Sequence, residues 1–258
     1  MANKRQRVVV VGGSSGLGRS IGVGLAQRGA HVAFLARRRD RLDRAAAEAG
    51  HGAVAITCDV TNEESCRAAI ARSAEVLGGI DALIYSTAVF LLAPLEEVGE
   101  ADWSRLMSTN VIGAALVTNA ALPHLRHSGG AAVYLSSVSA SLTPPWPMAG
   151  AYVTSKAALD KLVDAWRAEH PDVGFTRMTV GDSLGGEGDS RSGLPGLLDP
   201  EVLAQASTQW MSLGYMNGNL VEVDDVINTV EAVLTCSNAG TFPSLTLAPR
   251  ATPRALRQ

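Results

Sequence analysis

Short apolar runs alternate with helical patterns along almost the whole chain, and this alternation is what most constrains the fold. Runs typical of buried strands occupy residues 8–11, 31–35, 53–57, 81–85, 131–135, 173–179 and 242–247. Helical patterns separate them at residues 17–27, 40–49, 61–77, 103–125 and 221–234, with a further helix that contains residue 152 and ends near residue 169. Strands and helices that alternate at this spacing form βαβ units, so they predict a parallel sheet with helices on both faces.

Composition fits one α/β domain over residues 1–258. Hydrophobic residues make up 47% of the chain and charged residues 18%, which is ample for a core, and the net charge is only −3. Three cysteines without metal-ligand spacing indicate neither a disulfide framework nor a metal site. The N-terminal segment is too short in apolar residues for a signal peptide or a membrane span. We therefore expect a cytoplasmic protein with no metal, nucleic-acid or membrane partner.

A glycine-rich turn joins the first strand to the first helix. Its glycines permit a tight bend and let backbone N–H groups approach a pyrophosphate at the helix N-terminus. An ordinary strand–helix turn is the alternative, but the strand–turn–helix context favours a dinucleotide site. The expected contacts are Gly12, Ser14, Ser15, Gly16, Leu17 and Gly18.

The ends of the second and third strands indicate which dinucleotide binds. NAD sites usually place a carboxylate at the end of the second strand, but this chain has Ala36 followed by Arg37 and Arg38. A guanidinium pair suits a 2′-phosphate, so NADP is expected and NAD is disfavoured. Asp59 and Val60 follow the third strand. The Asp59 carboxylate could bind the adenine amino group or cap the next helix, and the two roles are compatible.

That next helix carries its own start signal. Thr61 is expected to be its N-cap, with Glu64 completing a capping box.

Tyr152 and Lys156 are four residues apart and therefore share one face of a helix. A nearby positive charge favours the phenolate and lowers the pKa of a tyrosine, which suits it to transfer a proton to a carbonyl oxygen. The alternative is an exposed helix with an unremarkable tyrosine and lysine.

Taken together, these segments resemble the short-chain dehydrogenase/reductase family over essentially the whole chain. The resemblance is carried by Gly12-xxx-Gly16-x-Gly18, Asp59-Val60, Asn110, Ser136-Ser137 and Tyr152-xxx-Lys156, in this order and at compatible separations. It implies a doubly wound, Rossmann-type sheet of about seven strands. It also implies hydride transfer between nicotinamide C4 and a carbonyl or alcohol carbon, and a homodimer or homotetramer.

The resemblance also implies a catalytic set. Tyr152 would be the proton donor, while Lys156 would lower the pKa of Tyr152 and bind the nicotinamide ribose. Ser137 would bind the substrate oxygen, and Asn110 would hold a water molecule. The strand-end pattern points to Ser137, although the usual family interval before the tyrosine would select Ser139.

Several segments depart from the family pattern. Tyr85-Ser86-Thr87-Ala88 stands where the family has Asn-Asn-Ala-Gly, with Thr87 expected on the nicotinamide side of the cofactor, and Asp182 follows the sixth strand. Residues 182–218 are expected to cover the substrate as a lid. Apolar residues there indicate an apolar substrate, or else a packed lid: Leu194, Leu197, Leu198, Trp210, Met211, Leu213 and Met216. Trp146 is expected either in the substrate pocket or at a surface or interface.

Two functions follow. The first is an NADP(H)-dependent oxidoreductase acting on a carbonyl or secondary alcohol, which the complete set of Asn110, Ser137, Tyr152 and Lys156 favours. The alternative is a non-catalytic NAD(P)-binding sensor or structural protein, which the departures after the fourth and sixth strands favour.

Overall fold

Seven parallel strands form one sheet in a computed structural model that describes residues 6–183, 185–186, 198–236 and 239–250. The strands lie in the order β3-β2-β1-β4-β5-β6-β7, and every neighbouring pair is parallel. Their bounds are β1 Arg7–Val11, β2 His31–Ala36, β3 Val54–Thr57, β4 Ala82–Tyr85, β5 Ala131–Ser137, β6 Gly174–Val180 and β7 Ser244–Leu247. The order reverses between β1 and β4, and in sheets of this kind ligands bind outside the carboxyl ends of the strands at such a point. The predicted doubly wound sheet is confirmed.

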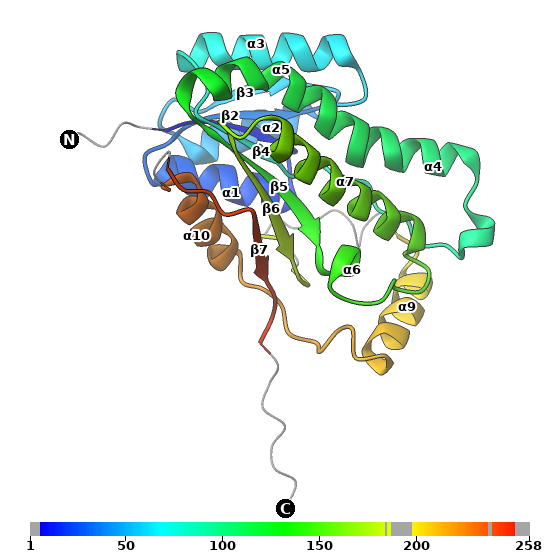
Figure 1. The fold of residues 1–258 in the computed structure, drawn as a ribbon. Coiled ribbons are helices and arrows are strands. Elements are labelled where there is room, and N and C mark those ends of the chain that lie inside the picture. The colour runs from blue at the N-terminus through cyan, green and yellow to red at the C-terminus, as the bar shows by residue number, and fades with distance from the viewer. Residues whose placement is uncertain (1–5, 184, 187–197, 237–238, 251–258) are drawn as a thin grey trace, which may run out of the picture.

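Helices cover both faces of the sheet, as Figure 1 shows. Val8 and Val10 of β1 contribute to the core beneath one set of helices, whereas Val9 and Val11 contribute to the core beneath the other. A strand buried on both faces needs apolar side chains at every position, which explains the unbroken valine run. The first set comprises α1 Gly16–Gln27, α2 Arg39–Ala49 and α10 Val223–Leu234, and the second comprises α3 Glu63–Leu77, α5 Gly113–Ser128 and α7 Gly150–Glu169.

The helix predicted over residues 103–125 is interrupted. It consists of α4 Glu100–Met107, a π-helical turn η2 Ser108–Ile112, and α5. At the turn, the buried hydroxyl of Tyr85 donates a hydrogen bond to the carbonyl oxygen of Thr109. π-turns are frequent at functional sites. The whole stretch Glu100–Ser128 is long and apolar enough to span a membrane by length and composition. However, half of its apolar 18-residue segment is buried inside the protein, and apolar side chains of α5 belong to the core beneath the sheet, as in a core helix.

Two helix starts differ from the sequence prediction. The N-cap of α3 is Asn62, whose side chain accepts a hydrogen bond from the backbone N–H of Ser65, so the assignment of Thr61 was wrong. The helix α9, Pro200–Ser212, was not predicted, although Asp199 caps it and Pro200 occupies its first position. A capping aspartate followed by proline is a recognised start signal that the sequence did contain. Two short helices complete the described elements, η1 Leu95–Glu97 and α6 Val138–Ser141.

Candidate active site

The glycine-rich turn packs tightly against the segment that follows β4. Gly12 has a φ of +89°, and a Cβ there would lie 2.8 Å from the backbone nitrogen of Thr87 and from the Ser86 hydroxyl. A Cβ on Gly18 would lie 2.6 Å from the carbonyl oxygen of Gly12. The Ser86 hydroxyl also donates to the carbonyl oxygen of Val11. The turn therefore needs glycine for both its conformation and its close packing, and α1 begins directly behind it.

Arg38 lies over this turn. Its guanidinium donates to the hydroxyls of Ser14 at 3.0 Å and Ser15 at 2.8 Å, and burial lowers its pKa. Ser15 is the N-cap of α1, and the first turn of that helix contains no acidic residue. Helix N-termini attract anions, so a guanidinium and two hydroxyls at this place form a site suited to phosphate. Arg37 is exposed, and its charge helps to lower the pKa of Asp59.

Asp59 stabilises the turn before α3. Its Oδ1 accepts hydrogen bonds from the backbone nitrogen of Thr61 at 3.0 Å and from the Thr61 hydroxyl at 2.8 Å. These bonds are the main reason that its pKa is lowered. The Val60 side chain is buried in the core beside Gly113. Asp59 thus stabilises the turn before α3 and does not cap the helix, whose N-cap is Asn62, while adenine binding by Asp59 and Val60 stays a prediction.

The helix α7 places Tyr152 and Lys156 against the carboxyl end of β5. The Lys156 ammonium is buried, donates to the carbonyl oxygen of Leu135 at 2.8 Å, and lies 6.0 Å from the centre of the Tyr152 ring. The side chain of Ser137, the last residue of β5, lies close enough to the Tyr152 hydroxyl to favour its ionised form. The end of β5 therefore lies beside both functional groups of the Tyr-xxx-Lys motif.

Burial dominates the electrostatics of this pair. It raises the pKa of Tyr152 to about 12, and the Ser137 side chain opposes this rise. Burial also lowers the pKa of Lys156 to about 8, although the negative charge of Asp160 acts to raise it. Both shifts have the direction expected when a charged form loses solvent. The expectation that Lys156 lowers the pKa of Tyr152 stays a prediction.

Ser137 and Ser139 have different surroundings. Their hydroxyl oxygens are 2.8 Å apart, and Ser137 caps α6 by accepting a bond from the backbone nitrogen of Ser139 at 3.3 Å. Ser139 is only 3% exposed, whereas Ser137 also lies near the Tyr152 hydroxyl. The influence of Ser137 on the pKa of Tyr152 favours Ser137 over Ser139, and the choice between the two serines stays a prediction.

Asn110 ties the segment after β4 to α7. It lies in the π-turn, fully buried; its Oδ1 accepts from the backbone nitrogen of Val89 at 2.8 Å, and its Nδ2 donates to the Val89 carbonyl oxygen at 3.0 Å. The same Nδ2 donates to the Ser155 hydroxyl at 2.9 Å, and that hydroxyl donates to the carbonyl oxygen of Tyr152. Sequence reasoning missed Ser155, although it lies within the Tyr-xxx-Lys segment.

Aromatic side chains wall one side of Tyr152. The Phe90 ring meets the Tyr152 ring edge-on, with centroids 4.5 Å apart. Trp146 packs on Trp210 at 4.8 Å and on Tyr215 at 6.1 Å, within one apolar cluster that also includes Tyr152. Trp146 is therefore buried beside the site and does not lie on the surface.

The predicted lid residues divide into three groups. Leu198, Trp210 and Met216 belong to the same apolar cluster as Trp146. Met211 and Leu213 are 50% and 47% exposed and lie outside this cluster. Leu194 and Leu197 lie outside the described residues.

Asp182 lies at the end of β6. Its backbone oxygen accepts from the backbone nitrogen of Val221 at 2.7 Å, and burial raises the pKa of its carboxyl to about 6.

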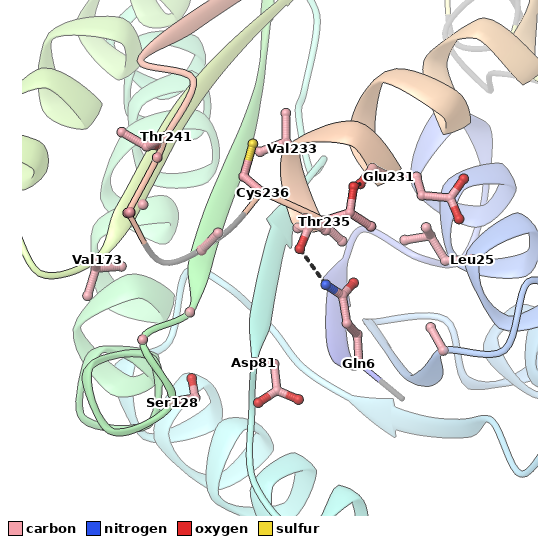
Figure 2. A pocket seen from close by; sticks show the side chains of 18 of the residues that line it. Gln6, Leu25, Asp81, Ser128, Val173, Glu231, Val233, Thr235, Cys236 and Thr241 are labelled. Carbon is pink, nitrogen blue, oxygen red and sulfur yellow. Dashed lines mark hydrogen bonds between the residues drawn. The ribbon is translucent and has the colours of Figure 1, made fainter. Parts of the chain in front are cut away.

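A cavity of about 780 Å³ lies at the opposite, amino-terminal end of the sheet and is shown in Figure 2. It is bordered by Gln6, Ser128 and Thr241, and Gln6 donates across it to the carbonyl oxygen of Leu234. Among the described residues, three acidic ones line it, and each forms an ion pair: Asp81 with Arg7, Asp172 with Arg126, and Glu231 with Arg28. None of the residues assigned to the candidate site borders this cavity, so its size does not make it the active site.

Comparisons with known proteins agree with this geometry. Residues 6–181 match the family model described as short chain dehydrogenase. The 11-beta-hydroxysteroid dehydrogenase-like protein 3 of Arabidopsis thaliana is 36% identical over 183 residues, which cover 69% of this chain and 59% of that protein. The dehydrogenase/reductase SDR family member 4 of Bos taurus is 34% identical over 58% of this chain and 55% of its own length. The matched region thus spans little more than half of each relative.

Solved structures share the fold over nearly the full chain. A putative short-chain alcohol dehydrogenase from Sinorhizobium meliloti superposes with a TM-score of 0.77 at 28% identity and covers 93% of this chain and 94% of that one. An alcohol dehydrogenase from Thermococcus sibiricus, solved with 5-hydroxy-NADP, has a TM-score of 0.78 at 24% identity and covers 95% and 96%. The family match, the parallel seven-stranded sheet and the Tyr152–Lys156 site together show that the chain belongs to the short-chain dehydrogenase/reductase family of oxidoreductases.

Proposed function

We propose that this protein transfers a hydride between NADP(H) and the carbonyl or secondary alcohol carbon of a small apolar substrate. The observation that carries the proposal is the convergence of Ser137, Tyr152 and Lys156 at the carboxyl end of β5, with Asn110 fixing the neighbouring segment. A phenol, an alcohol and an ammonium in a largely buried site can bind an oxygen and supply the proton it needs as negative charge develops.

The cofactor end fits a phosphorylated dinucleotide. A Cβ at Gly12 or Gly18 would clash with the segment after β4 or with the turn itself, so the tight turn that lets backbone N–H groups approach a pyrophosphate depends on glycine. Arg38 with Ser14 and Ser15 would hold the 2′-phosphate, because a guanidinium forms charge-assisted bonds with phosphate oxygens. A nicotinamide cofactor supplies the hydride, and the protein supplies position and proton transfer.

Each catalytic residue is proposed for one task. The Tyr152 hydroxyl donates a proton to the substrate oxygen, and the Ser137 hydroxyl orients that oxygen. Lys156, held by the Leu135 carbonyl, provides the positive charge that favours the phenolate left on Tyr152. Asn110 holds the segment at Val89 in place and keeps α7 in register through Ser155.

The substrate side of the site is apolar. Phe90 and Trp146, with Trp210 behind, present aromatic surface next to Tyr152. A hydrophobic ketone or alcohol is favoured by such a wall, since burial of apolar area stabilises it by roughly 25 cal/mol per Å². The hydroxysteroid dehydrogenase names of several relatives support an apolar substrate class.

The test combines NADPH fluorescence titration with turnover on a panel of hydrophobic aldehydes and ketones. We expect Tyr152→Phe to abolish turnover while NADPH affinity stays within about threefold, because only the proton donor is lost. Substantial residual turnover in this variant would refute the role of Tyr152.

One observation favours a second candidate, a cofactor-binding sensor without turnover. The Tyr85 hydroxyl is used to hold the Thr109 carbonyl in a buried contact. The segment after β4 is therefore built differently from the family pattern. NADPH binding by the unmodified protein without turnover on any compound of the panel would favour this candidate.

A further inference from the structure

Alternating charges follow one face of α7 from the active site to the surface. Lys156, Asp160 and Asp164 are spaced by four residues and share this face. Arg177 of β6 reaches between the two acids, with its Nη1 at 3.9 Å from Asp160 Oδ2 and 3.9 Å from Asp164 Oδ2. Arg167 closes the series by bonding Asp164 at 3.1 Å. The sign of the charge thus alternates at every step outward from Lys156.

Asp160 is the innermost acid of this series and is poorly satisfied. It is 4% exposed, and its Oδ2 accepts only a long hydrogen bond, 3.4 Å, from the Ser141 hydroxyl. Its Oδ1 is buried and accepts no hydrogen bond from any described residue. Burial raises the pKa of this carboxyl, while Ser136 and Arg177 oppose the rise. A buried carboxylate with so few donors is costly, which points to a partner charge that benefits from it.

Lys156 is the other buried charged residue on this face of α7, one helical turn before Asp160, and the two form no direct ion pair among the described contacts. Its ammonium has three donors, but among the described residues the one bond recorded goes to the Leu135 carbonyl. Asp160 is the group whose charge raises the pKa of Lys156 against burial. The other polar groups near this pair come from α7, β5, β6, α6 and η2. Most of them are neutral: Tyr152, Ser136, Ser137, Ser141 and Asn110. The charged ones are Arg177, which is positive, and Asp164, which lies one turn further out on α7.

We propose that Asp160, buried one helical turn from Lys156 on the same face of α7, is a positioning residue that favours the charged form of Lys156, and that Ser141 and Arg177 hold the Asp160 carboxylate in place. This inference deepens the proposed function and rests on it for its catalytic meaning, since a charged Lys156 is what favours the Tyr152 phenolate. The charge coupling itself needs neither cofactor nor substrate. It can therefore be measured separately from turnover.

The experiment is a direct titration of Lys156. The chain has only three lysines, Lys4, Lys156 and Lys161, so ¹³C-labelled lysine gives three Cε signals. These are assigned with Lys4→Arg and Lys161→Arg. In the unmodified protein we expect the Lys156 signal to titrate near pH 8, where burial places its pKa at about 8. In Asp160→Asn, which keeps the shape but removes the charge, we expect the midpoint to fall by about one pH unit.

Three variants make the result specific. Asp160→Glu keeps the charge and should retain a midpoint close to that of the unmodified protein. Asp164→Asn, on the same face but one turn further out, should shift the midpoint much less because its carboxylate is 34% exposed. If Asp160→Asn does not fold, as judged by urea unfolding, Asp160→Ala is titrated instead.

The outcomes separate the two proposals. The role of Asp160 is overturned if the Lys156 midpoint is unchanged in folded Asp160→Asn or Asp160→Ala. It is also overturned if Asp160→Glu or Asp164→Asn shifts the midpoint as much as Asp160→Asn does. A lowered midpoint supports the role even if no carbonyl is turned over. Where turnover is found, the alkaline fall of kcat/KM should occur at lower pH in Asp160→Asn than in the unmodified protein. In Asp160→Glu this fall should occur at the pH of the unmodified protein. A variant that had merely lost structure would instead show lower activity at every pH.

Discussion

The choice between NADPH and NADH should depend on Arg38. Its guanidinium donates to Ser14 at 3.0 Å and to Ser15 at 2.8 Å, and a bound 2′-phosphate would replace or add to these contacts. Hydrogen bonds to a charged group contribute about 1.5–3 kcal/mol each. Arg38 already bonds two hydroxyls, so a bound 2′-phosphate would partly replace existing hydrogen bonds of the guanidinium. The net gain in NADPH binding free energy should therefore lie near the lower end of this range, at about 2 kcal/mol. That corresponds to an NADPH affinity roughly 30-fold weaker in Arg38→Ala.

The assay is fluorescence titration of NADPH and NADH into the unmodified protein, Arg38→Ala and Arg39→Ala. Arg39 is a matched control, because it is the next residue and its guanidinium pairs with Asp43 on the surface. We expect NADH affinity to change less than threefold in both variants. Added salt should reduce the preference for NADPH, since the contact is ionic. If Arg38→Ala weakened NADH as much as NADPH, Arg38 would merely support the glycine-rich turn, and the argument for NADP would fail.

Three further predictions concern stability. Gly18→Ala places a Cβ 2.1 Å from the Ser86 hydroxyl and should lower the free energy of unfolding, measured by urea titration, by about 2 kcal/mol. The control is Gly99→Ala, whose Cβ meets nothing within 4 Å and which should change this free energy by less than about 0.5 kcal/mol. Tyr85→Phe removes the donor to the π-turn carbonyl in a buried contact and should cost about 1–3 kcal/mol in the same measurement; no loss would mean that another donor satisfies that carbonyl. Lys156 has a pKa of about 8 in the folded state, below its ordinary value of 10.5, so the unfolded chain binds its proton more tightly between these values and stability rises with pH in that window. As pH rises from 8 to 10.5, the stability of the unmodified protein relative to Lys156→Met should therefore increase by about 3 kcal/mol, and a difference that does not depend on pH would contradict the shift.

The sheet and most helices could be predicted because their signals are local. Buried parallel strands such as β1 require continuous apolar residues, and the glycines at the turn into α1 follow from its backbone conformation. The helix α9 also has a local start signal in Asp199-Pro200, so it too could be predicted from the sequence. The wrong N-cap of α3 has a different cause. Thr61 and Asn62 are both good caps, and the bond from Thr61 to Asp59 decided between them.

The candidate site also combines features that the local sequence predicts with features that depend on tertiary packing. The four-residue spacing of Tyr152 and Lys156 fixed their common face, and the order of motifs fixed their place at the end of β5. No local pattern could show which serine faces Tyr152. That depends on how the end of β5 and the start of α6 pack against α7.

The sequence by itself therefore determined the fold class, the family and the residue types available for chemistry, because burial periodicity and turn conformation are properties of neighbouring residues. Only the tertiary structure decided that Tyr85 holds a π-turn, that Arg38 covers the glycine-rich turn, and that Arg177 of β6 lies beside the buried Asp160. These facts depend on contacts between segments far apart in the chain, where packing sets the distances and burial sets the strength of each charge.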